Sequence, residues 1–477
     1  MSTNRPNVLL ITVDEMRKDA LGCYGNGVID TPHLDRLAGH SMVFDNAYTV
    51  SPWCLPSRCA MLTGQFPHRS GAYSNFRKCE LNAEIPNFFS TLKAQDYRTS
   101  MIGKCHFAPV PYNETRPDET LPFQERDYYH SLGIDHLYVQ DGNQVSVWFS
   151  DDYSLELEQA GFLASFRDAV WNKDFMKSFP FPGPPEWHPD SRVGAKAVEY
   201  VETCNSDESQ CIWVSFSGPH FPFDAPSEYY SRVNMDKLRE EKLSRLEGEF
   251  DDPDRIFHWA YHGGGPGIEG SKNAPGGACK NYSEEYWTEI RRNTYANIAQ
   301  IDDWVGKLLD AAESKFGDDL LIIFTSDHGD VLGNHTLWGK NTCAYEDVLN
   351  VPLIVKYPGR PEPQRDSTRV MSTNVCPTIL KAAGVEATEC DGIDFLDDVN
   401  RGGSTYTFAE GERFVTVSDG HHKYVQAEKG GKQFYELFDL REDREEFYNI
   451  IEDPNYQGQL ADLRREVANH FMSTLLP

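Results

Sequence analysis

Three short apolar runs, each leading to an acidic or histidine side chain, constrain this chain most strongly. The runs cover 7–13, 210–216 and 320–325, and they are followed by Asp14, by His220 and by Asp327 with His328. Continuous apolar runs of this length are typical of strands buried on both faces of a parallel sheet. Ligand sites in open sheets of this kind collect at the carboxyl ends of the strands. The sequence therefore predicts an α/β fold whose chemistry lies at one edge of a sheet.

Two helices and a further strand can be placed around these runs. A fourth apolar run at 351–357 is stopped by Pro358-Gly359, and Thr31-Pro32 forms a suitable helix start, with Thr31 as the N-cap. Residues 283–316 have helical periodicity with one apolar stripe, a start at Ser283 and a stop at Gly317. We interpret this long helix as a packing element.

The residue composition and the hydrophobic pattern change along the chain. Two segments, near 109–189 and 251–280, look like insertions because they are rich in aromatic, acidic, proline or glycine residues. From about residue 402, short alternating runs are separated by polar turns, and a helical tail follows from Tyr456. We expect a large N-terminal domain over 1–400 that contains both insertions, and a smaller α+β domain over 401–477 with a small antiparallel sheet and a helix.

The charge balance limits the partners of this chain. Its 477 residues carry 45 basic and 74 acidic side chains, which gives a net charge of −29. Nucleic acids and anionic membranes are bound through clustered Lys and Arg, so we expect neither as a partner. No apolar run reaches the length of a membrane span, and the polar N-terminus predicts no signal peptide. The odd number of cysteines, eleven, without repeat spacing indicates mostly free thiols and a cytoplasmic protein.

The segment 54–64 carries the strongest functional signal. It reads Cys-Leu-Pro-Ser-Arg-Cys-Ala-Met-Leu-Thr-Gly. It resembles the hallmark of the sulfatase family, Cys (or Ser)-X-Pro-Ser-Arg followed by Leu-Thr-Gly, at every defining position. A cysteine taken alone is more often a buried packing residue. The resemblance implies an alkaline-phosphatase-like fold, in which a mixed sheet is flanked by helices, and a sulfatase catalytic domain in the N-terminal part.

The same resemblance implies a modified nucleophile. A separate formylglycine-generating enzyme is expected to convert Cys54 to formylglycine, whose hydrate carries two hydroxyls. One hydroxyl attacks the sulfate, and the other later loses its proton and expels sulfate as the aldehyde re-forms. A thiolate would instead leave a dead-end adduct, so the modification suits the reaction.

The resemblance also implies one divalent cation. Asp14 resembles the first metal ligand of the family and Asp327-His328 the second pair, with the nucleophile at Cys54 completing the set. Oxygen ligands favour Ca²⁺, and the nitrogen of His328 leaves Mn²⁺ as the alternative. Many sulfatases have a second Asp directly after the first, whereas this chain has Glu15, which is a further candidate ligand. A histidine at the position of His328 also occurs in phosphonate monoester hydrolases and choline sulfatases, so the resemblance points near that branch.

The remaining catalytic candidates come from shorter motifs. Lys104 and His106 stand in a Gly-Lys-X-His segment, in which the family uses Lys and His to hold the nucleophile and to take its proton. Arg58, in the hallmark, is expected to orient the same group. His220 lies in Pro-His-X-Pro and suits a proton donor to the leaving oxygen near neutral pH. Lys340 resembles the lysine that binds sulfate and neutralises the leaving alkoxide.

The substrate contacts implied by the resemblance are Asn75, Lys104, His220 and Lys340. The sequence therefore predicts a hydrolase that cleaves a sulfate monoester of a sugar or another small alcohol or phenol. A phosphonate monoester or phosphodiester hydrolase with the same nucleophile and metal is the alternative. A non-catalytic binding protein for sulfated glycans is disfavoured by the complete set of catalytic residue types. The net charge of −29 weakly favours a small substrate over a long polyanion, and the oligomeric state is left open.

Overall fold

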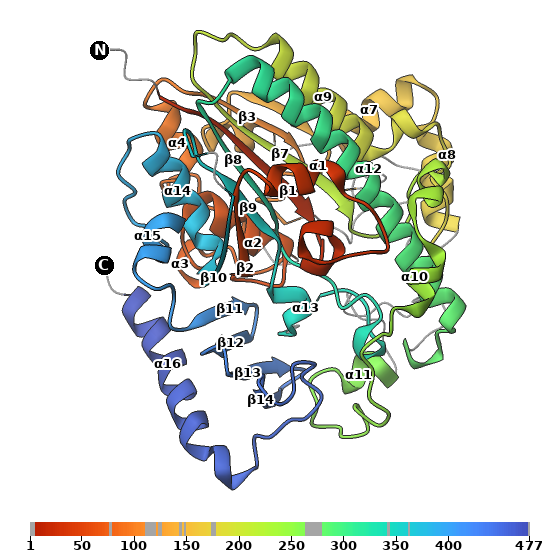
Figure 1. The fold of residues 1–477 in the computed structure, drawn as a ribbon, viewed down its shortest axis with the longest axis vertical. Coiled ribbons are helices and arrows are strands. Elements are labelled where there is room, and N and C mark those ends of the chain that lie inside the picture. The colour runs from red at the N-terminus through yellow and green to blue at the C-terminus, as the bar shows by residue number, and fades with distance from the viewer. Residues whose placement is uncertain are drawn as a thin grey trace.

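The fold is built on one large mixed sheet with helices on both faces (Figure 1). The computed structural model describes residues 5–75, 79–109, 121–122, 126–142, 146, 149–172, 178–262, 279–340, 344–360 and 363–475. The strand order of the sheet is β10-β2-β9-β8-β1-β7-β3-β5. The strands are β1 (Asn7–Asp14), β2 (Met42–Tyr48), β3 (Arg98–Gly103), β5 (His136–Val139), β7 (Gln210–Pro219), β8 (Leu320–Ser326), β9 (Leu353–Lys356) and β10 (Gln364–Met371).

The centre of the sheet is parallel. Strand β1 pairs in parallel with both β7 and β8, and β3 pairs in parallel with β7 and β5. Strand β9 runs antiparallel to β8 and β2 and makes the sheet mixed. The three apolar runs are therefore neighbouring strands, and their carboxyl ends meet at one edge. The predicted α/β class with a mixed sheet flanked by helices is confirmed.

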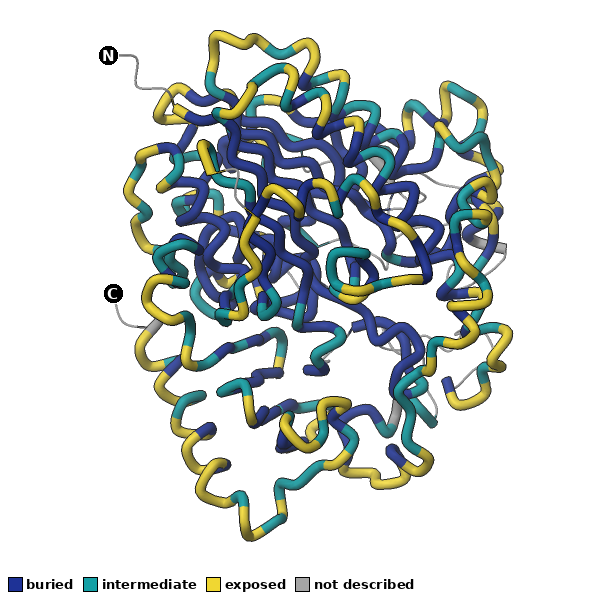
Figure 2. Tube along the Cα trace, in the orientation of Figure 1, coloured by how far each residue is buried: buried dark blue, intermediate teal, exposed yellow. Residues whose placement is uncertain are grey.

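Both faces of the central strands are covered, which explains their continuous apolar sequence. In β1, Leu9 and Ile11 face one buried cluster, while Val8 and Leu10 face the other, as the alternation of a strand requires. The first cluster includes residues of α1 (Pro32–Ala38), α9 (Pro189–Thr203) and α12 (Glu284–Phe316), and the second includes residues of α2 (Cys54–Thr63), α4 (Phe88–Lys93) and α14 (Val375–Ala382). Figure 2 shows the strands of this sheet as the most continuously buried part of the trace.

The long helix α12 follows the expectation closely. The Ser283 hydroxyl oxygen accepts a hydrogen bond from the Tyr286 amide, and the helix ends before Gly317, whose φ is 64°. Helix α1 begins at Pro32 as expected, but Thr31 does not cap it. The Thr31 hydroxyl accepts a hydrogen bond from the Gly22 amide instead.

The cap of α1 comes from α12. The Asp302 carboxylate accepts hydrogen bonds from the amides of His33 (3.2 Å) and Leu34 (2.8 Å). Burial raises the pKa of Asp302 to about 6, although these two amides oppose the shift. A partner so distant in the sequence satisfies the helix start as a local N-cap would.

Several elements lie in segments that the sequence suggested as insertions. The segment near 109–189 contributes the edge strand β5, a two-residue pair of strands and three helices. These are β4 (Leu121–Pro122), β6 (Phe149–Ser150), α5 (Arg126–Ser131), α7 (Asp152–Gln159) and α8 (Leu163–Asn172). The segment near 251–280 contributes α11 (His258–His262). The rest of the glycine-rich part, 263–278, lies outside the described residues.

A second, smaller sheet follows the large one in the chain. Its order is β11-β12-β13-β14, and all its pairings are antiparallel, as predicted. The strands are β11 (Thr407–Gly411), β12 (Phe414–Ser418), β13 (His422–Lys429) and β14 (Lys432–Asp439), and helix α16 (Gln457–Leu475) packs on this sheet (Figure 1). The other α-helices in the described part of the chain are α3 (Pro67–Ser70), α10 (Met235–Glu240), α13 (Glu346–Leu349) and α15 (Phe395–Asn400). Whether the chain divides into domains at residue 400 stays a prediction.

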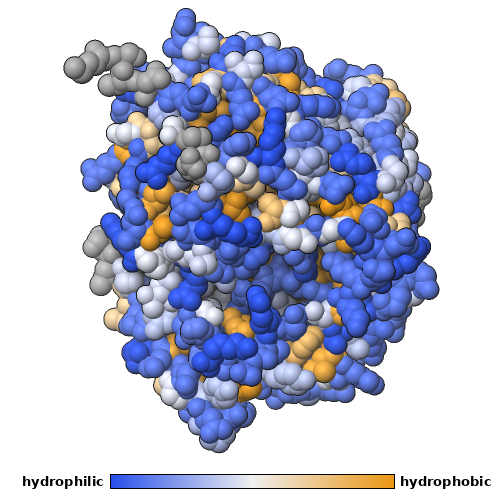
Figure 3. All heavy atoms as spheres, in the orientation of Figure 1, coloured by the Kyte–Doolittle hydropathy of each residue, from blue (hydrophilic) through white to orange (hydrophobic). Residues whose placement is uncertain are grey.

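The surface in view is mostly hydrophilic. Figure 3 shows apolar residues scattered in small patches among hydrophilic ones on this face. Of the helices that the structure describes, none is both long and apolar enough to span a membrane.

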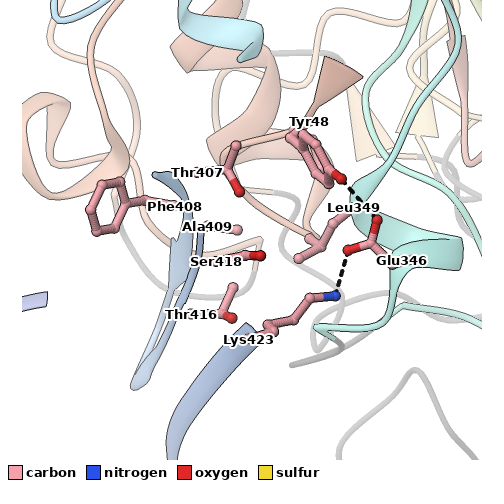
Figure 4. Close-up of a pocket in the computed structure, with 10 residues that line it drawn as sticks. Tyr48, Glu346, Leu349, Thr407, Phe408, Ala409, Thr416, Ser418 and Lys423 are labelled. Carbon is pink, nitrogen blue, oxygen red and sulfur yellow. Dashed lines mark hydrogen bonds and ion pairs between the residues drawn. The ribbon is translucent and has the colours of Figure 1, made fainter. Parts of the chain in front are cut away.

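A buried charge cluster joins the two sheets (Figure 4). The Lys423 ammonium on β13 pairs with Glu346 (2.7 Å) and Glu446 (2.8 Å), and it donates a hydrogen bond to the Ala344 carbonyl. From the large sheet, the Tyr48 hydroxyl donates to the Glu346 carboxylate (3.0 Å). Burial raises the pKa of Glu446 to about 7, although Lys423 opposes that shift. One buried cation thus offsets one buried carboxyl group, Glu446, and one half-buried carboxyl group, Glu346, where the sheets meet.

We predict that Lys423→Met destabilises the protein by about 3–5 kcal/mol, because it leaves the buried Glu446 and the half-buried Glu346 without their cation. The free energy of unfolding from urea denaturation measures the effect. The matched control is Lys432→Met, whose exposed pair with Asp254 (2.6 Å) should contribute no more than about 1 kcal/mol. Equal effects of the two substitutions would contradict the proposed importance of the buried cluster.

Candidate active site

The chemistry-bearing side chains gather where the parallel strands end. Asp14 ends β1, the segment with Lys104 and His106 follows β3, His220 follows β7, and Asp327 with His328 follows β8. Cys54 is the first residue of α2, and Arg58 lies one turn further along that helix. The convergence follows from the topology, because carboxyl ends of neighbouring parallel strands share one edge.

Four of these side chains form a compact set of metal-type ligands. One ligand atom from each of Asp14, Cys54, Asp327 and His328 lies within 4.8 Å of all the others, and all four residues are buried. The Cys54 sulfur lies 3.2 Å from His328 Nε2 and 3.7 Å from Asp14 Oδ1. His328 Nδ1 contacts the Gly329 carbonyl at 3.0 Å, so the other ring nitrogen faces the cluster. The structure thus brings together the four predicted ligands, and their donor chemistry fits one divalent cation.

The environment of Cys54 favours an anion. Burial raises the pKa of its thiol, but the charges of Lys104, Lys340 and His328 outweigh burial and hold the pKa well below the ordinary value. The residue also stands at the N-terminus of α2, where the helix dipole stabilises negative charge. Whatever oxygen or sulfur nucleophile occupies position 54 therefore sits in a positive field.

Arg58 connects the two aspartates. Its Nε donates to Asp327 Oδ2 (2.9 Å), and its Nη2 lies 3.6 Å from Asp14 Oδ2. Its Nη1 donates to the Ser215 hydroxyl oxygen (2.6 Å) and to the Lys104 carbonyl (3.0 Å). The side chain is fully buried, and its contacts come from β1 and β7 and from the segments that follow β3 and β8. Arg58 thus holds the carboxylates of Asp14 and Asp327 in position, and its expected role in orienting the nucleophile stays a prediction.

The loop after β3 places Lys104 and His106 beside Cys54. Gly103 has a φ of 106°, and a Cβ there would lie 2.0 Å from the Ser215 carbonyl oxygen, so no other residue fits. The Lys104 ammonium pairs with Asp14. His106 lies close enough to the Cys54 sulfur to lower the pKa of the thiol, but no hydrogen bond of good geometry joins either of its buried ring nitrogens to a described residue. An additional hydroxyl at position 54 would satisfy one of them.

A second group of charges lies close to Asp14 and is centred on Glu15. Glu15 Oε2 is 2.9 Å from the Lys340 ammonium and 3.3 Å from His220 Nε2. The other carboxylate oxygen, Oε1, is buried and has no partner among the described residues. Glu15 is held at a positive φ of 68°, and its amide donates to Asp327 Oδ1 (3.1 Å). Glu15 therefore pairs with Lys340 and His220 in this structure, and a ligand role for it stays a prediction.

Asn75 reaches the start of α2. Its side-chain oxygen accepts a hydrogen bond from the amide of Leu55, which directly follows Cys54. This contact brings Asn75 to the nucleophile, and its predicted contact with substrate stays a prediction.

The sequence reading missed several residues that hold the site together. Asp141 Oδ1 accepts hydrogen bonds from the amides of Cys105 (2.9 Å) and His106 (2.8 Å). Asp190 Oδ1 accepts from the amides of Ser217 and Gly218, both at 3.0 Å, just before His220. Neither aspartate lies in a motif that marks it. Only the three-dimensional structure shows that they fix the loops carrying His106 and His220.

Comparison with known proteins identifies the family. The family model described as Sulfatase matches residues 6–385, and the one described as N-sulphoglucosamine sulphohydrolase, C-terminal, matches residues 333–472. The chain is 28% identical over 477 residues to a choline-sulfatase of Rhizobium meliloti (strain 1021), covering 95% of this chain and 84% of that protein. It is 26% identical over 482 residues to an arylsulfatase of Clostridium perfringens (strain 13 / Type A), covering 97% and 93%.

Solved structures agree on the fold. The phosphonate monoester hydrolase of Agrobacterium radiobacter superposes with a TM-score of 0.76 at 22% identity, covering 98% of this chain and 95% of that one. A sulfatase of Bacteroides fragilis superposes with a TM-score of 0.71 at 20% identity, covering 100% and 97%. With a family match over most of its length, and with an alkaline-phosphatase-like fold, this chain belongs to the sulfatase family of hydrolases.

Proposed function

We propose that this enzyme hydrolyses a sulfate monoester of a sugar, another small alcohol or a phenol, and releases the alcohol and inorganic sulfate. The observation that carries the proposal is the set of cations around position 54. The charges of Lys104 and Lys340 both lower the pKa of the Cys54 thiol, and Arg58 lies one helical turn away from Cys54. Such fixed positive groups in a buried site stabilise the charge that develops on sulfate oxygens in the transition state.

The nucleophile in this proposal is Cys54 after conversion to formylglycine by a separate maturation enzyme. The hydrated aldehyde supplies one hydroxyl to attack sulfur and a second whose deprotonation releases sulfate. The two ring nitrogens of His106, which no hydrogen bond of good geometry joins to a described residue, support the proposal, because the thiol lacks the second hydroxyl. His106 would take that hydroxyl's proton, and Lys104 would stabilise the oxygen anion.

The proposed metal site comprises Asp14, Asp327, His328 and the nucleophile at position 54. A cation bound there would lower the pKa of the nucleophile and draw charge from the sulfate oxygens. Two carboxylates favour a hard ion such as Ca²⁺, and the nitrogen of His328 makes Mn²⁺ the alternative. Without a cation, burial and the Asp14 charge raise the pKa of Asp327, although His328 and Arg58 oppose the shift. A divalent ion would relieve this repulsion between carboxylates.

His220 is the proposed acid for the leaving oxygen. Its Nδ1 contacts the Phe221 carbonyl at 2.7 Å, so this nitrogen carries a hydrogen, and the protonated ring also carries one at Nε2. Nε2 lies against Glu15 in the site, and 15% of the His220 side chain is exposed, so a substrate can reach it. Lys340 would hold the sulfate oxygens from the same side.

Two broader expectations belong to the same proposal. Every proposed site residue precedes residue 341, so the catalytic machinery lies within 1–400, and 401–477 flank it. All cysteines that the structure describes are free thiols, in keeping with the proposed cytoplasmic location. The partners we propose are a small sulfated substrate and the maturation enzyme.

Phosphonate monoester or phosphodiester hydrolysis is the second candidate. It shares the nucleophile and the metal ligands, and the observation that favours it is the histidine at position 328. Transferring a phosphoryl group uses the same cations and the same leaving-group acid.

The test of the main proposal compares two substrates on protein co-expressed with a maturation enzyme. We expect peptide mass spectrometry to show an aldehyde at position 54, and kcat/KM for nitrophenyl sulfate to exceed that for a nitrophenyl phosphonate ester. Activity should rise with the converted fraction and vanish in Cys54→Ala, whereas the control Cys204→Ala, far along the chain at the end of α9, should stay active. Full activity of an unmodified thiol would exclude the formylglycine mechanism, and a preference for the phosphonate would establish the second candidate.

A second prediction tests His220. An alkoxide leaves slowly without a proton, while a nitrophenolate needs little help, and general acid assistance is commonly worth about 10²–10⁴-fold. His220→Ala should therefore reduce kcat/KM for an alkyl or sugar sulfate by about that factor, and far less for nitrophenyl sulfate. Lys340→Ala should weaken both substrates, and His421→Ala, in an exposed turn of the small sheet, serves as the control. If His220→Ala reduces both substrates equally, the acid role passes to Lys340.

A further inference from the structure

Three segments far apart in the sequence bring His68, Glu410 and His470 together. They belong to α3, to β11 and to α16, and one ligand atom from each lies within 4.8 Å of the others. His68 Nδ1 is 2.6 Å from Glu410 Oε1, and His470 Nε2 is 3.7 Å from the same oxygen. Two imidazole nitrogens thus converge on one carboxylate oxygen, and none of the three residues is assigned to the sulfatase site.

The charge of Glu410 needs a partner at this place. Only 3% of the residue is exposed, and among the described residues its ion pairs are with His68 and His470 alone. Burial raises the pKa of Glu410, but the two imidazoles outweigh it and lower the pKa, so the carboxylate is ionised. Imidazoles are largely neutral near neutral pH, and a buried carboxylate is stabilised by a proton on one of them or by a metal ion.

We propose that His68, Glu410 and His470 bind a divalent transition-metal cation of the Zn²⁺ type, at a site separate from the catalytic metal. Two histidine nitrogens and one carboxylate oxygen are a known ligand set for zinc, with a fourth position open to water. In this geometry the close contact between His68 and Glu410 is a hydrogen bond. A bound cation replaces its proton, so binding releases a proton to solvent.

The surroundings of the cluster suit such a site. A cavity of about 730 Å³ borders it and is lined by Pro67, His68, Tyr73, Glu410, Glu412 and Phe471, among others. The cavity provides an entry path and room for a water ligand. The His470 ring is stacked on Phe408 at 4.1 Å and meets Phe66 edge-on at 4.4 Å. These aromatic contacts fix the direction of the ring, as outer-shell groups do around metal ligands.

The cation would link helix α16 to helix α3 and strand β11. Helix α3 directly follows α2, the helix that begins at Cys54, whereas α16 is the last helix and packs on the small sheet. A shared ion therefore connects α16 to α3, the helix that follows the one beginning at Cys54. Its expected effect is on stability, because none of its ligands is among the residues proposed for sulfate chemistry.

The test uses the full chain without an affinity tag, stripped by a chelator and then saturated with Ca²⁺ to fill the catalytic site. Co²⁺ titration followed by visible absorption should show one tightly bound equivalent that Zn²⁺ displaces with loss of colour. Zn²⁺ should also raise Tm by several degrees and release protons on binding. His470→Gln, His68→Gln and Glu410→Gln should each lose this equivalent and the Tm increase, with far-UV circular dichroism showing that the variants are folded.

Two controls locate the bound ion. The double substitution Asp14→Asn with Asp327→Asn should keep the Co²⁺ equivalent, and His421→Gln should keep it as well. The proposal is overturned if the three ligand variants bind as much Co²⁺ as the unchanged protein, or if the double substitution abolishes the binding. A stability that changes with pH near neutrality, without any cation binding, would show that the cluster holds only a proton and would overturn the proposal too.

Discussion

The buried ion pair of Arg58 with two aspartates is the interaction on which the site depends. Asp14 and Asp327 lie close enough to share a cation, and like charges at such separations repel strongly in a buried environment. The Arg58 guanidinium contacts both, and Lys104 adds a second positive charge beside Asp14. Burial raises the pKa of Asp14, but the charges of Lys104, His220 and Lys340 outweigh it and hold that pKa below its ordinary range. The protein can therefore keep the ligand carboxylates assembled before any metal or substrate arrives.

Sequence reasoning succeeded where a single local pattern determines the structure. The apolar runs of β1, β7 and β8 correctly predicted strands buried on both faces. Ser283 and Gly317 correctly predicted where α12 begins and ends. It failed where neighbours in space decide. Strand β10 lies at the sheet edge, where most of its residues are polar and all but one are exposed or half-buried, so it carries no apolar signal. The cap of α1 comes from Asp302, 268 residues beyond Leu34, and no local rule indicates such a partner.

The same distinction holds for the site. Residues inside a motif, such as Arg58 and His220, could be proposed with a role, because the motif fixes both type and order. Asp141 and Asp190 could not, since their work is to accept backbone hydrogen bonds from loops contributed by other strands. An aspartate in such a position has no sequence signature, because any segment that reaches the loop can supply it. The supporting residues of a site are thus less predictable than its reactive ones.

The buried Lys423 cluster has a consequence for how the molecule unfolds. Its cation belongs to the small sheet, while Glu346 precedes strand β9 of the large one. Separating the two sheets removes the Lys423 cation from the Glu346 carboxylate. The loss of this ion pair raises the free energy of any state in which only one sheet is unfolded. The two sheets should then behave as one cooperative unit, in which the amide hydrogens of β13 and α13 exchange with solvent through the same rare opening.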